Sequence, residues 1–361
     1  MKPLSILLGC AILLLLTHCL EKYPDGSSAR ASVLLALAED VALARFVEFQ
    51  ERSAEMEAAA VAFCADPSEA SLKAARDAWW AAKEPWKRNE VVRFGPIMEY
   101  PRRFGPKIDD WPVIESAVED LVDDEGELDQ AAFDSMGTGT RGLPVVEYLL
   151  WGAGEDTLEA LTNSARRCAI LEGAARDVHA NAGRLVVDWS QTWILQLSQP
   201  ASAPDARYEN MQEVLDEWVN RMGFTVENIR VEKLGKPVGD KADGKPQPDT
   251  IESRHSGRSL LEAKDALAGV HDIWTGGSGE ESLGVSALVS DTELIALVDT
   301  HFEAAMTTLA AIPDTLEDTI SGDTSTVVAA QDALRELHRV IQVDLATKIG
   351  VTIGFNDSDG D

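Results

Sequence analysis

Residues 66–86 read Asp-Pro-Ser-Glu-Ala-Ser-Leu-Lys-Ala-Ala-Arg-Asp-Ala-Trp-Trp-Ala-Ala-Lys-Glu-Pro-Trp. Apolar side chains recur in this stretch at intervals of three and four residues, at Leu72, Ala75, Trp79, Ala82 and Trp86. That spacing places them on one face of an α-helix. Asp66 is expected to cap the helix, with Pro67 at its first position and Glu69 closing a capping box. The stretch therefore predicts an amphipathic helix that packs in a helical core.

The same periodicity continues through most of the chain. Four further stripes run through Leu171, Ala175, Val178, Ala182, Leu185 and Trp189; Met211, Leu215, Trp218, Met222 and Ile229; Leu294, Val298, Ala305, Leu309 and Ile312; and Leu334, Leu337, Ile341 and Leu345. Alternating apolar and polar residues, the mark of strands, are nearly absent. We therefore predict an all-α protein.

Breaks in the helical pattern divide the chain. Residues 196–204, rich in Ser, Ala and Pro, form the clearest linker and leave about 165 residues on each side. We expect two helical-bundle domains, each resembling a four-helix bundle, over residues 34–198 and 205–361. Residues 90–112 and 234–259 are rich in Gly and Pro, and we read them as long ordered connections, one in each bundle.

The amino terminus has the pattern of an export signal. Lys2 precedes an apolar run from Leu4 to Leu16 that is too short to span a membrane. The run ends at Leu-Thr-His-Cys, similar to a bacterial lipobox, although His18 stands where a small residue is usual. We expect residues 1–18 to be a lipoprotein signal peptide, Cys19 to carry the lipid, and residues 19–33 to form a polar tether.

The charge balance excludes several functions. The chain has 32 Lys and Arg against 62 Asp and Glu, a formal net charge of −30. A nucleic-acid partner needs a basic surface, and polybasic attachment to anionic lipid does too. We therefore expect no nucleic-acid partner, and contact with a membrane only through a lipid on Cys19. A strongly acidic protein attracts cations or neutral molecules.

Two cysteines remain in the folded part of the chain, Cys64 and Cys168. They pair as a disulfide in an oxidising compartment or stay as buried thiols, and their spacing does not choose between these alternatives. The sequence has no His-Glu-x-x-His zinc motif, no Gly-x-Ser-x-Gly nucleophile elbow and no phosphate-binding glycine loop. Generic motifs therefore indicate no enzyme class.

The segment Gly142-Leu-Pro-Val-Val-Glu-Tyr-Leu-Leu-Trp151 contains an acidic residue among apolar ones. Pro144 suits the first position of a helix, which would place Glu147 in the first turn, where the helix dipole favours a carboxylate. A partly buried glutamate also needs a cation, a hydrogen-bond donor or its own proton. Both a structural and a functional role for Glu147 stay open at this point.

Several blocks together resemble the imelysin family, also classed as the M75 peptidases. They are Trp79 with Glu84-Pro85-Trp86, Gly95-Pro96-Ile97, Asp110-Trp111-Pro112, Gly142–Trp151, Glu252-Ser-Arg-His-Ser256 with Ser259-Leu260, and the closing residues 345–361. The resemblance implies a fold of two four-helix bundles and a functional site near their interface. That site centres on a Gly-x-His-x-x-Glu motif, which here falls on Gly142, Pro144 and Glu147. Proline replaces the histidine, so this position can neither bind a metal nor transfer a proton.

The resemblance also implies that Glu252, Ser253, Arg254 and Ser256 lie near Glu147. Alternatively, Glu252 and Arg254 are an exposed ion pair, and Ser256 caps a helix. Glu147 is the one candidate metal ligand, and iron or another metal is a candidate cofactor.

Three functions are compatible with these observations. The first is a non-catalytic, ligand-binding lipoprotein linked to bacterial iron uptake, anchored in the outer membrane and facing the periplasm. The second is an M75-type metallopeptidase using Glu147, and the third is a structural lipoprotein of the cell envelope. Because the motif lacks its histidine, the sequence favours a role without catalysis.

Overall fold

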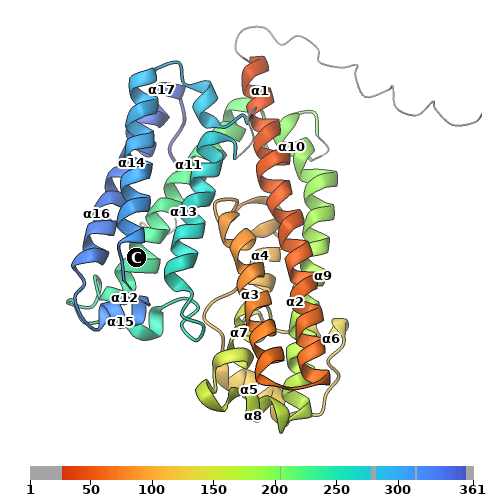
Figure 1. The fold of residues 1–361 in the computed structure, drawn as a ribbon. Coiled ribbons are helices and arrows are strands. Elements are labelled where there is room, and N and C mark those ends of the chain that lie inside the picture. Colours follow the sequence, from red (N-terminus) through yellow and green to blue (C-terminus); the bar gives the residue numbers. More distant parts are fainter. Residues whose placement is uncertain (1–26, 204, 278–281, 314, 355–361) are drawn as a thin grey trace, which may run out of the picture.

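The computed structural model describes residues 27–203, 205–277, 282–313 and 315–354. Within these ranges the chain is helical without strands, which confirms the predicted all-α class. Figure 1 shows two groups of long helices standing side by side. The signal peptide, Cys19 and the beginning of the expected tether lie outside the described residues. None of the described helices combines the length and apolarity needed to cross a membrane.

The first bundle contains the long helices α1 (Ser27–Ala36), α2 (Ala44–Ala65), α3 (Glu69–Arg88) and α9 (Ala165–Asp188). Helix α1 runs into α2 through the π-helical η1 (Leu37–Leu43), and α9 continues through the π-helical η5 (Trp189–Trp193) into α10 (Ile194–Ser198). Short helices connect α3 to α9: η2 (Gly95–Ile97), α4 (Phe104–Ile108), α5 (Glu115–Asp123), α6 (Gln130–Ser135), η3 (Thr138–Thr140), α7 (Leu143–Trp151), η4 (Gly154–Asp156) and α8 (Thr157–Thr162).

The second bundle contains α11 (Met211–Asn228), α13 (Ser259–Thr275), α14 (Thr292–Ala310) and α16 (Ser325–Arg339). Helix α11 continues through the π-helical η6 (Ile229–Gly235) into α12 (Lys236–Val238), and α16 through the π-helical η9 (Val340–Leu345) into α17 (Ala346–Ile349). Three short elements complete it, η7 (Pro248–Thr250), η8 (Val285–Leu288) and α15 (Leu316–Ile320).

Three predicted boundaries differ from the structure. Helix α3 begins at Glu69, capped by Ser68 and not by Asp66, because the Ser68 hydroxyl accepts a hydrogen bond from the Ser71 amide at 3.2 Å. Helix α1 begins at Ser27, so part of the expected tether is helical, and its Val33 is buried. Helix α10 extends to Ser198 into the expected linker, because the side chains of Gln196 and Leu197 are buried there.

The apolar stripes form the cores of the bundles. Leu72, Ala75, Trp79 and Ala82 are fully buried on α3, and Trp86 is partly buried at its end. In the first bundle a disulfide joins Cys64 of α2 to Cys168 of α9, with their Cα atoms 5.6 Å apart. The structure thereby selects the paired alternative for these two cysteines.

Helices α3 and α13 bring the two bundles into direct contact. The backbone of α13 comes so close to the end of α3 that a Cβ atom at Gly269 would overlap the carbonyl oxygen of Arg88. One turn away, the Arg88 guanidinium donates to the Asp272 carboxylate at 2.8 Å. Any side chain larger than hydrogen at position 269 would force the helices apart. The contact fixes the position of α3 relative to the second bundle.

Candidate functional site

Two buried lysines lie on α3 beside its tryptophans. Lys83 and Lys87 are four residues apart, so they lie on one face of the helix, and only 1% and 5% of their surfaces are exposed. A buried ammonium group is unstable unless it is paired with negative charge. This face of α3 therefore requires carboxylates from elsewhere in the chain.

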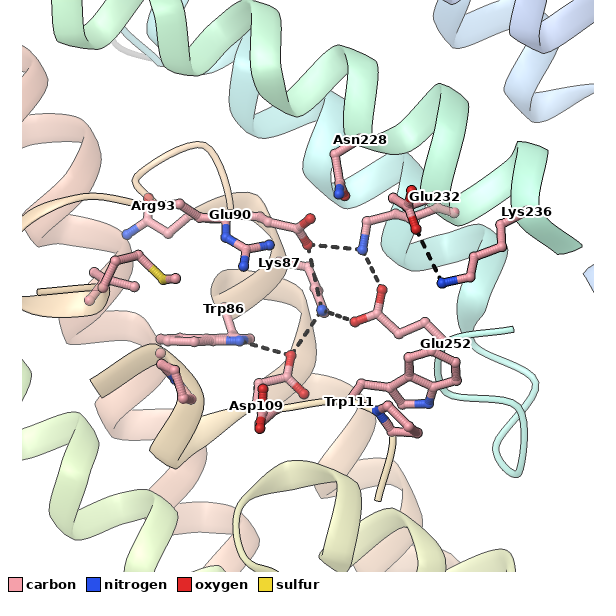
Figure 2. A pocket seen from close by; sticks show the side chains of 18 of the residues that line it. Trp86, Lys87, Glu90, Arg93, Asp109, Trp111, Asn228, Glu232, Lys236 and Glu252 are labelled. Carbon is pink, nitrogen blue, oxygen red and sulfur yellow. Dashed lines mark hydrogen bonds and ion pairs between the residues drawn. The ribbon is translucent and has the colours of Figure 1, made fainter. Parts of the chain in front are cut away.

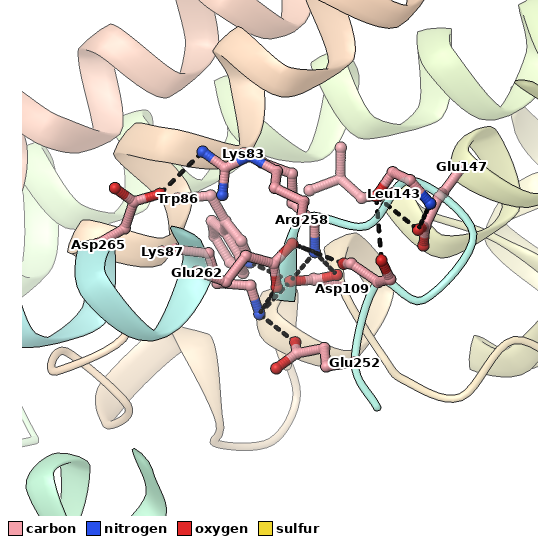
Figure 3. A network of polar contacts seen from close by, with 12 residues as sticks. Lys83, Trp86, Lys87, Asp109, Leu143, Glu147, Glu252, Arg258, Glu262 and Asp265 are labelled. Carbon is pink, nitrogen blue, oxygen red and sulfur yellow. Dashed lines mark hydrogen bonds and ion pairs between the residues drawn. The ribbon is translucent and has the colours of Figure 1, made fainter. Parts of the chain in front are cut away.

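The carboxylates come from both bundles (Figure 3). Asp109, directly after α4, accepts from Lys83 Nζ at 2.9 Å and forms an ion pair with Lys87 at 2.9 Å. Glu262 of α13 lies 3.4 Å from Lys83 Nζ and 3.5 Å from Lys87 Nζ. Glu252, in the loop after η7, accepts a hydrogen bond from Lys87. The two lysines thus join the first bundle to the second through buried ion pairs.

A third lysine comes from a π-helical segment. Lys233 of η6 is buried, donates to Glu252 and lies 3.0 Å from the carboxylate of Glu90 at the end of α3. A π-helical insertion changes the direction of the side chains that follow it, and such insertions are frequent at functional sites. We refer to Lys83, Lys87, Lys233, Glu90, Asp109, Glu252 and Glu262 as the ion-pair cluster.

Opposite charges shift the pKa values of Glu252, Lys87 and Glu90 in the direction that favours their ionised forms. Burial alone would raise the pKa of Glu252, but Lys233 and Lys87 hold it well below its ordinary value. Burial alone would lower the pKa of Lys87, but Asp109 and Glu252 raise it well above the usual value. The pKa of Glu90 is also lowered, against the effect of burial, by Lys233 and Lys87. Each buried charge is therefore stabilised by charges of opposite sign.

A cavity of about 330 Å³ opens beside the cluster, between the two bundles. Its walls come from the end of α3, the segment 93–112, the region of α11, η6 and α12, and Glu252 with Thr250. Figure 2 shows Lys87, Glu90, Asp109 and Glu252 at its centre, Trp86 and Trp111 toward the lower side and Arg93 and Asn228 toward the upper side. The lining has no His, Cys or Ser. The volume is in the lower part of the range for ligand pockets, roughly 300 to 1,000 Å³.

Glu147 lies near the cluster but has its own partners. One of its carboxylate oxygens accepts from the Ser256 backbone amide at 2.8 Å and from the Ser256 hydroxyl at 2.7 Å (Figure 3). The residue is 2% exposed. Burial raises the pKa of Glu147 to about 7, while the charge of Lys83 and the two hydrogen bonds act in the opposite direction. Glu147 therefore exchanges a proton near neutral pH.

The helix start beside Glu147 differs from the expectation. Helix α7 begins at Leu143, so Pro144 is its second residue and Glu147 its fifth, one position beyond the first turn. The helix dipole therefore does not explain how the Glu147 carboxylate is stabilised, whereas the two hydrogen bonds from Ser256 do. Gly142 precedes the helix with φ +81, and a Cβ there would lie 2.5 Å from the carbonyl oxygen of Ile108. This glycine permits the close packing of α7 against the end of α4.

The other predicted site residues separate into buried and exposed positions. Ser253 is buried, with φ +50, and its hydroxyl donates to Glu262 at 2.6 Å. Arg254 donates to Glu115 at 2.7 Å and to Asp249 at 2.6 Å. Its side chain therefore pairs with these two carboxylates, and its predicted role at the site with Glu147 stays a prediction. Ser256 does not cap a helix, because α13 begins at Ser259. Its hydroxyl donates to Glu147 instead.

Sequence reasoning missed the three lysines and three of the four carboxylates of the cluster, namely Lys83, Lys87, Lys233, Glu90, Asp109 and Glu262. A usable signal existed for the first two, because they stand one helical turn apart on the same stretch as Trp79 and Trp86. No local signal identifies Asp109 or Glu262 as their partners. The pairs with Asp109 depend on how the end of α4 lies beside α3 within the first bundle, and those with Glu262 depend on the contact between the bundles.

The described part of the chain contains no group of three or more His, Cys, Asp or Glu side chains arranged to hold a metal ion. Glu147 thus lacks a ligand set around it in those residues. The carboxylates of the ion-pair cluster are directed at lysines. The arrangement is suited to holding a small polar molecule in the cavity through hydrogen bonds and charge.

Comparison with known proteins assigns the fold and the family. The chain is 26% identical over 315 residues to iron-regulated protein A of Synechococcus elongatus, covering 82% of this chain and 80% of that protein. The crystal structure of an imelysin-like protein from Psychrobacter arcticum superposes with a TM-score of 0.76 at 21% identity, over 92% of this chain and 98% of that one. A structure described as an iron-regulated protein A precursor from Parabacteroides distasonis gives 0.77 at 20% identity, over 91% and 96%.

The sequence model of the imelysin family matches residues 42–341, which include most of both bundles, α7 and the ion-pair cluster. The resemblance inferred from the sequence blocks is thereby confirmed, and this chain belongs to the imelysin family.

Proposed function

We propose that this protein binds a small ligand in the cavity between its bundles, without catalysis, and serves bacterial iron uptake. The cavity beside the ion-pair cluster carries this proposal. Its charged inner wall is already neutralised by internal pairs, which supports a preformed binding surface. The lining has no His, Cys or Ser that could act as nucleophile or imidazole base, and Pro144 occupies the histidine position of the family motif.

The link to iron rests on relatives. Two similar proteins carry the name iron-regulated protein A, one of them 26% identical to this chain. Their names describe regulation by iron and do not identify a ligand. A binding protein made in response to iron would hold an iron complex, or an organic molecule that takes part in its uptake.

We also propose that the chain is exported and anchored by a lipid on Cys19, in the outer membrane facing the periplasm. The apolar run before Cys19 and the lipobox-like ending support export. The Cys64–Cys168 disulfide supports it too, because structural disulfides persist in oxidising compartments.

Calorimetric titration tests the binding function. Purified protein is titrated with buffered ferric iron, ferric citrate, haem and small organic acids, and we expect at least one to bind. The variant Asn228→Arg places a larger side chain in the cavity and should abolish that binding, whereas Arg335→Ala on the exposed face of α16 should leave it unchanged. Silence across the whole panel, or full binding by Asn228→Arg, would overturn the proposal.

Labelling of cells with a radioactive fatty acid tests the anchor. The wild-type chain should carry the label and fractionate with the outer membrane. Replacing Cys19 by Ser should remove the label and release the protein from that fraction. A labelled Cys19→Ser chain would contradict the assignment of the lipid to this residue.

A further inference from the structure

The polar side chains that line the cavity fall into two sets. The first set already has partners within the protein: Lys87, Lys233, Glu90, Asp109 and Glu252 of the ion-pair cluster contact opposite charges. Outside the cluster, Thr138 donates to Asp110, Lys236 to Glu232, and Thr250 to the carbonyl oxygen of Gln247. The second set has no hydrogen bond or ion pair to any described residue: the guanidinium of Arg93, the indole N–H of Trp111 and the side-chain amide of Asn228. The first set builds the wall, and the second set is available to a ligand.

Most of the available groups are hydrogen-bond donors; the side-chain oxygen of Asn89, a buried acceptor without a hydrogen bond to the described residues, is the exception. Arg93 has five N–H donors and no acceptor, Trp111 has one donor, and Asn228 has two donors and one acceptor. Arg93 is exposed to solvent at the cavity, and its positive charge contributes to lowering the pKa of Glu90. A planar guanidinium matches a carboxylate, with two parallel hydrogen bonds. The donors therefore indicate a ligand with an anionic, acceptor-rich end.

The cavity also has flat apolar surfaces. Trp86 is held by its indole N–H, which donates to Asp109 at 2.9 Å, so that its ring has a fixed position in the wall. Trp111 is half-buried across the cavity, next to Pro112 (Figure 2). Aromatic rings prefer stacked or edge-on contact with other flat groups. Two tryptophans and a volume of about 330 Å³ suit one small ring.

A cationic ligand fits these observations less well, despite the net charge of −30. Asp109 is occupied by Lys83, Lys87 and Trp86, and Glu252 by Lys87 and Lys233. A ligand cation would have to displace a buried lysine from its partner, and breaking a buried ion pair is costly. An anion at Arg93 would break no hydrogen bond or ion pair among the described residues.

We propose that the cavity binds a small aromatic carboxylate, with its carboxylate on Arg93 and Asn228 and its ring against Trp86 and Trp111. This inference rests on the proposed binding function and names its ligand class. It also limits the ligand to a size near a single substituted ring, because the cavity lies in the lower part of the range for ligand pockets.

Benzoate is the probe, compared with benzamide, which keeps the ring without the charge, acetate, which keeps the charge without the ring, and benzylamine, which is cationic. Saturation-transfer NMR and calorimetry on the purified protein measure binding. We expect benzoate to bind, and the other three to bind at least about tenfold more weakly, because each loses the charge-assisted bonds or the ring contact.

Variants then locate the carboxylate. Arg93→Ala should weaken benzoate binding about 10- to 100-fold, since hydrogen bonds to charged groups are the stronger kind, and Arg93→Lys should lie between it and the wild type. Arg93 is exposed, so folding should be unaffected, and circular dichroism checks this. Arg335→Ala, an exposed arginine paired with Asp332 on α16, is the matched control and should bind as the wild type does.

Three results would overturn the ligand class: unchanged benzoate affinity in Arg93→Ala, no benzoate binding at millimolar concentration, or tighter binding of benzylamine than of benzoate. In each case, binding of an iron compound that Asn228→Arg abolishes would leave the proposed function intact. Absence of binding by every compound in both panels would instead remove the function as well. Preference for benzylamine would show that the carboxylates, and not Arg93, select the ligand.

Discussion

Glu147 of the first bundle and Ser256 of the second are joined by two hydrogen bonds to one carboxylate oxygen, 2.8 Å from the backbone amide and 2.7 Å from the hydroxyl. The contact connects α7 to the loop before α13. It is buried and involves a group whose pKa lies near 7. The protonation of Glu147 therefore affects the stability of the two-bundle structure.

Stability should fall as the pH rises from about 4.5 to 7. Below pH 4.5, Glu147 is protonated in both the folded and the unfolded chain. Between pH 4.5 and 7 the unfolded chain loses this proton first, because the pKa of Glu147 is 4.5 in the unfolded chain and about 7 in the folded protein. The unfolded state then binds fewer protons, so the free energy of unfolding decreases, by about 3 kcal/mol at most. Urea unfolding across this pH range measures the change.

Glu147→Gln isolates this effect, because the amide oxygen still accepts from Ser256 but does not ionise. In this variant, the free energy of unfolding should decrease much less between pH 4.5 and 7 than it does in the wild type. Asp265, whose pKa burial raises to about 6 against the effect of Arg258, contributes a smaller decrease that should persist in both proteins. The exposed Glu84→Gln serves as the control. If the pH profiles of wild type and Glu147→Gln coincide, Glu147 does not titrate near neutrality.

Removing the charge of Lys87 should destabilise the protein strongly. Its ammonium group contacts Asp109 at 2.9 Å, Glu252, and Glu90 and Glu262 at 3.5 Å each. Lys87→Met leaves these carboxylates buried with too few cations, which costs about 3–5 kcal/mol of unfolding free energy. Chemical denaturation of the purified variant measures the loss.

Lys236→Met is the matched control, because Lys236 is half-exposed and lies 3.4 Å from Glu232. Its effect should stay within about 0.5 kcal/mol. Adding Glu252→Gln to Lys87→Met should recover part of the lost stability, since it removes one of the uncompensated charges. Equal effects of the two lysine substitutions would show that the buried cluster is not ionised.

Reduction of the Cys64–Cys168 disulfide should lower stability while leaving the fold in place. The bond closes a segment with a sequence separation of 104 residues. Restricting an unfolded chain over such a length is worth about 2–5 kcal/mol. The paired variant Cys64→Ser with Cys168→Ser should unfold at correspondingly lower denaturant concentration. Detection of two free thiols in the unreduced protein would contradict the pairing.

Local patterns predicted the helices well because the spacing of apolar residues is a local property. Leu72, Ala75, Trp79 and Ala82 were placed on one buried face from the sequence, and the structure buries all four. Helix ends were predicted less accurately: Asp66 and Ser68 are both suitable caps, and the hydroxyl contact between Ser68 and Ser71 favours the second. Such competition between neighbouring caps depends on fine geometry.

The candidate site could be predicted only in part. The resemblance brought Glu147 and Ser256 together, and the structure joins them directly. The cluster around Lys87 was not predicted, because Asp109 follows a short helix that ends beside α3 and Glu252 lies in a loop of the other bundle, and neither position is set by local sequence. The resemblance did not indicate the partner of Arg254 either: its guanidinium donates to Glu115 of the first bundle.

The close approach of Gly269 to the carbonyl oxygen of Arg88 bears on how a ligand reaches its cavity. Many binding proteins open like a clamshell about a flexible hinge, which requires a side-chain layer that can slide or separate. Here the two halves touch backbone to backbone, and the Arg88–Asp272 pair fastens the same point. Opening of that kind would break both contacts at once. The two bundles are therefore expected to stay together while a ligand enters or leaves the cavity.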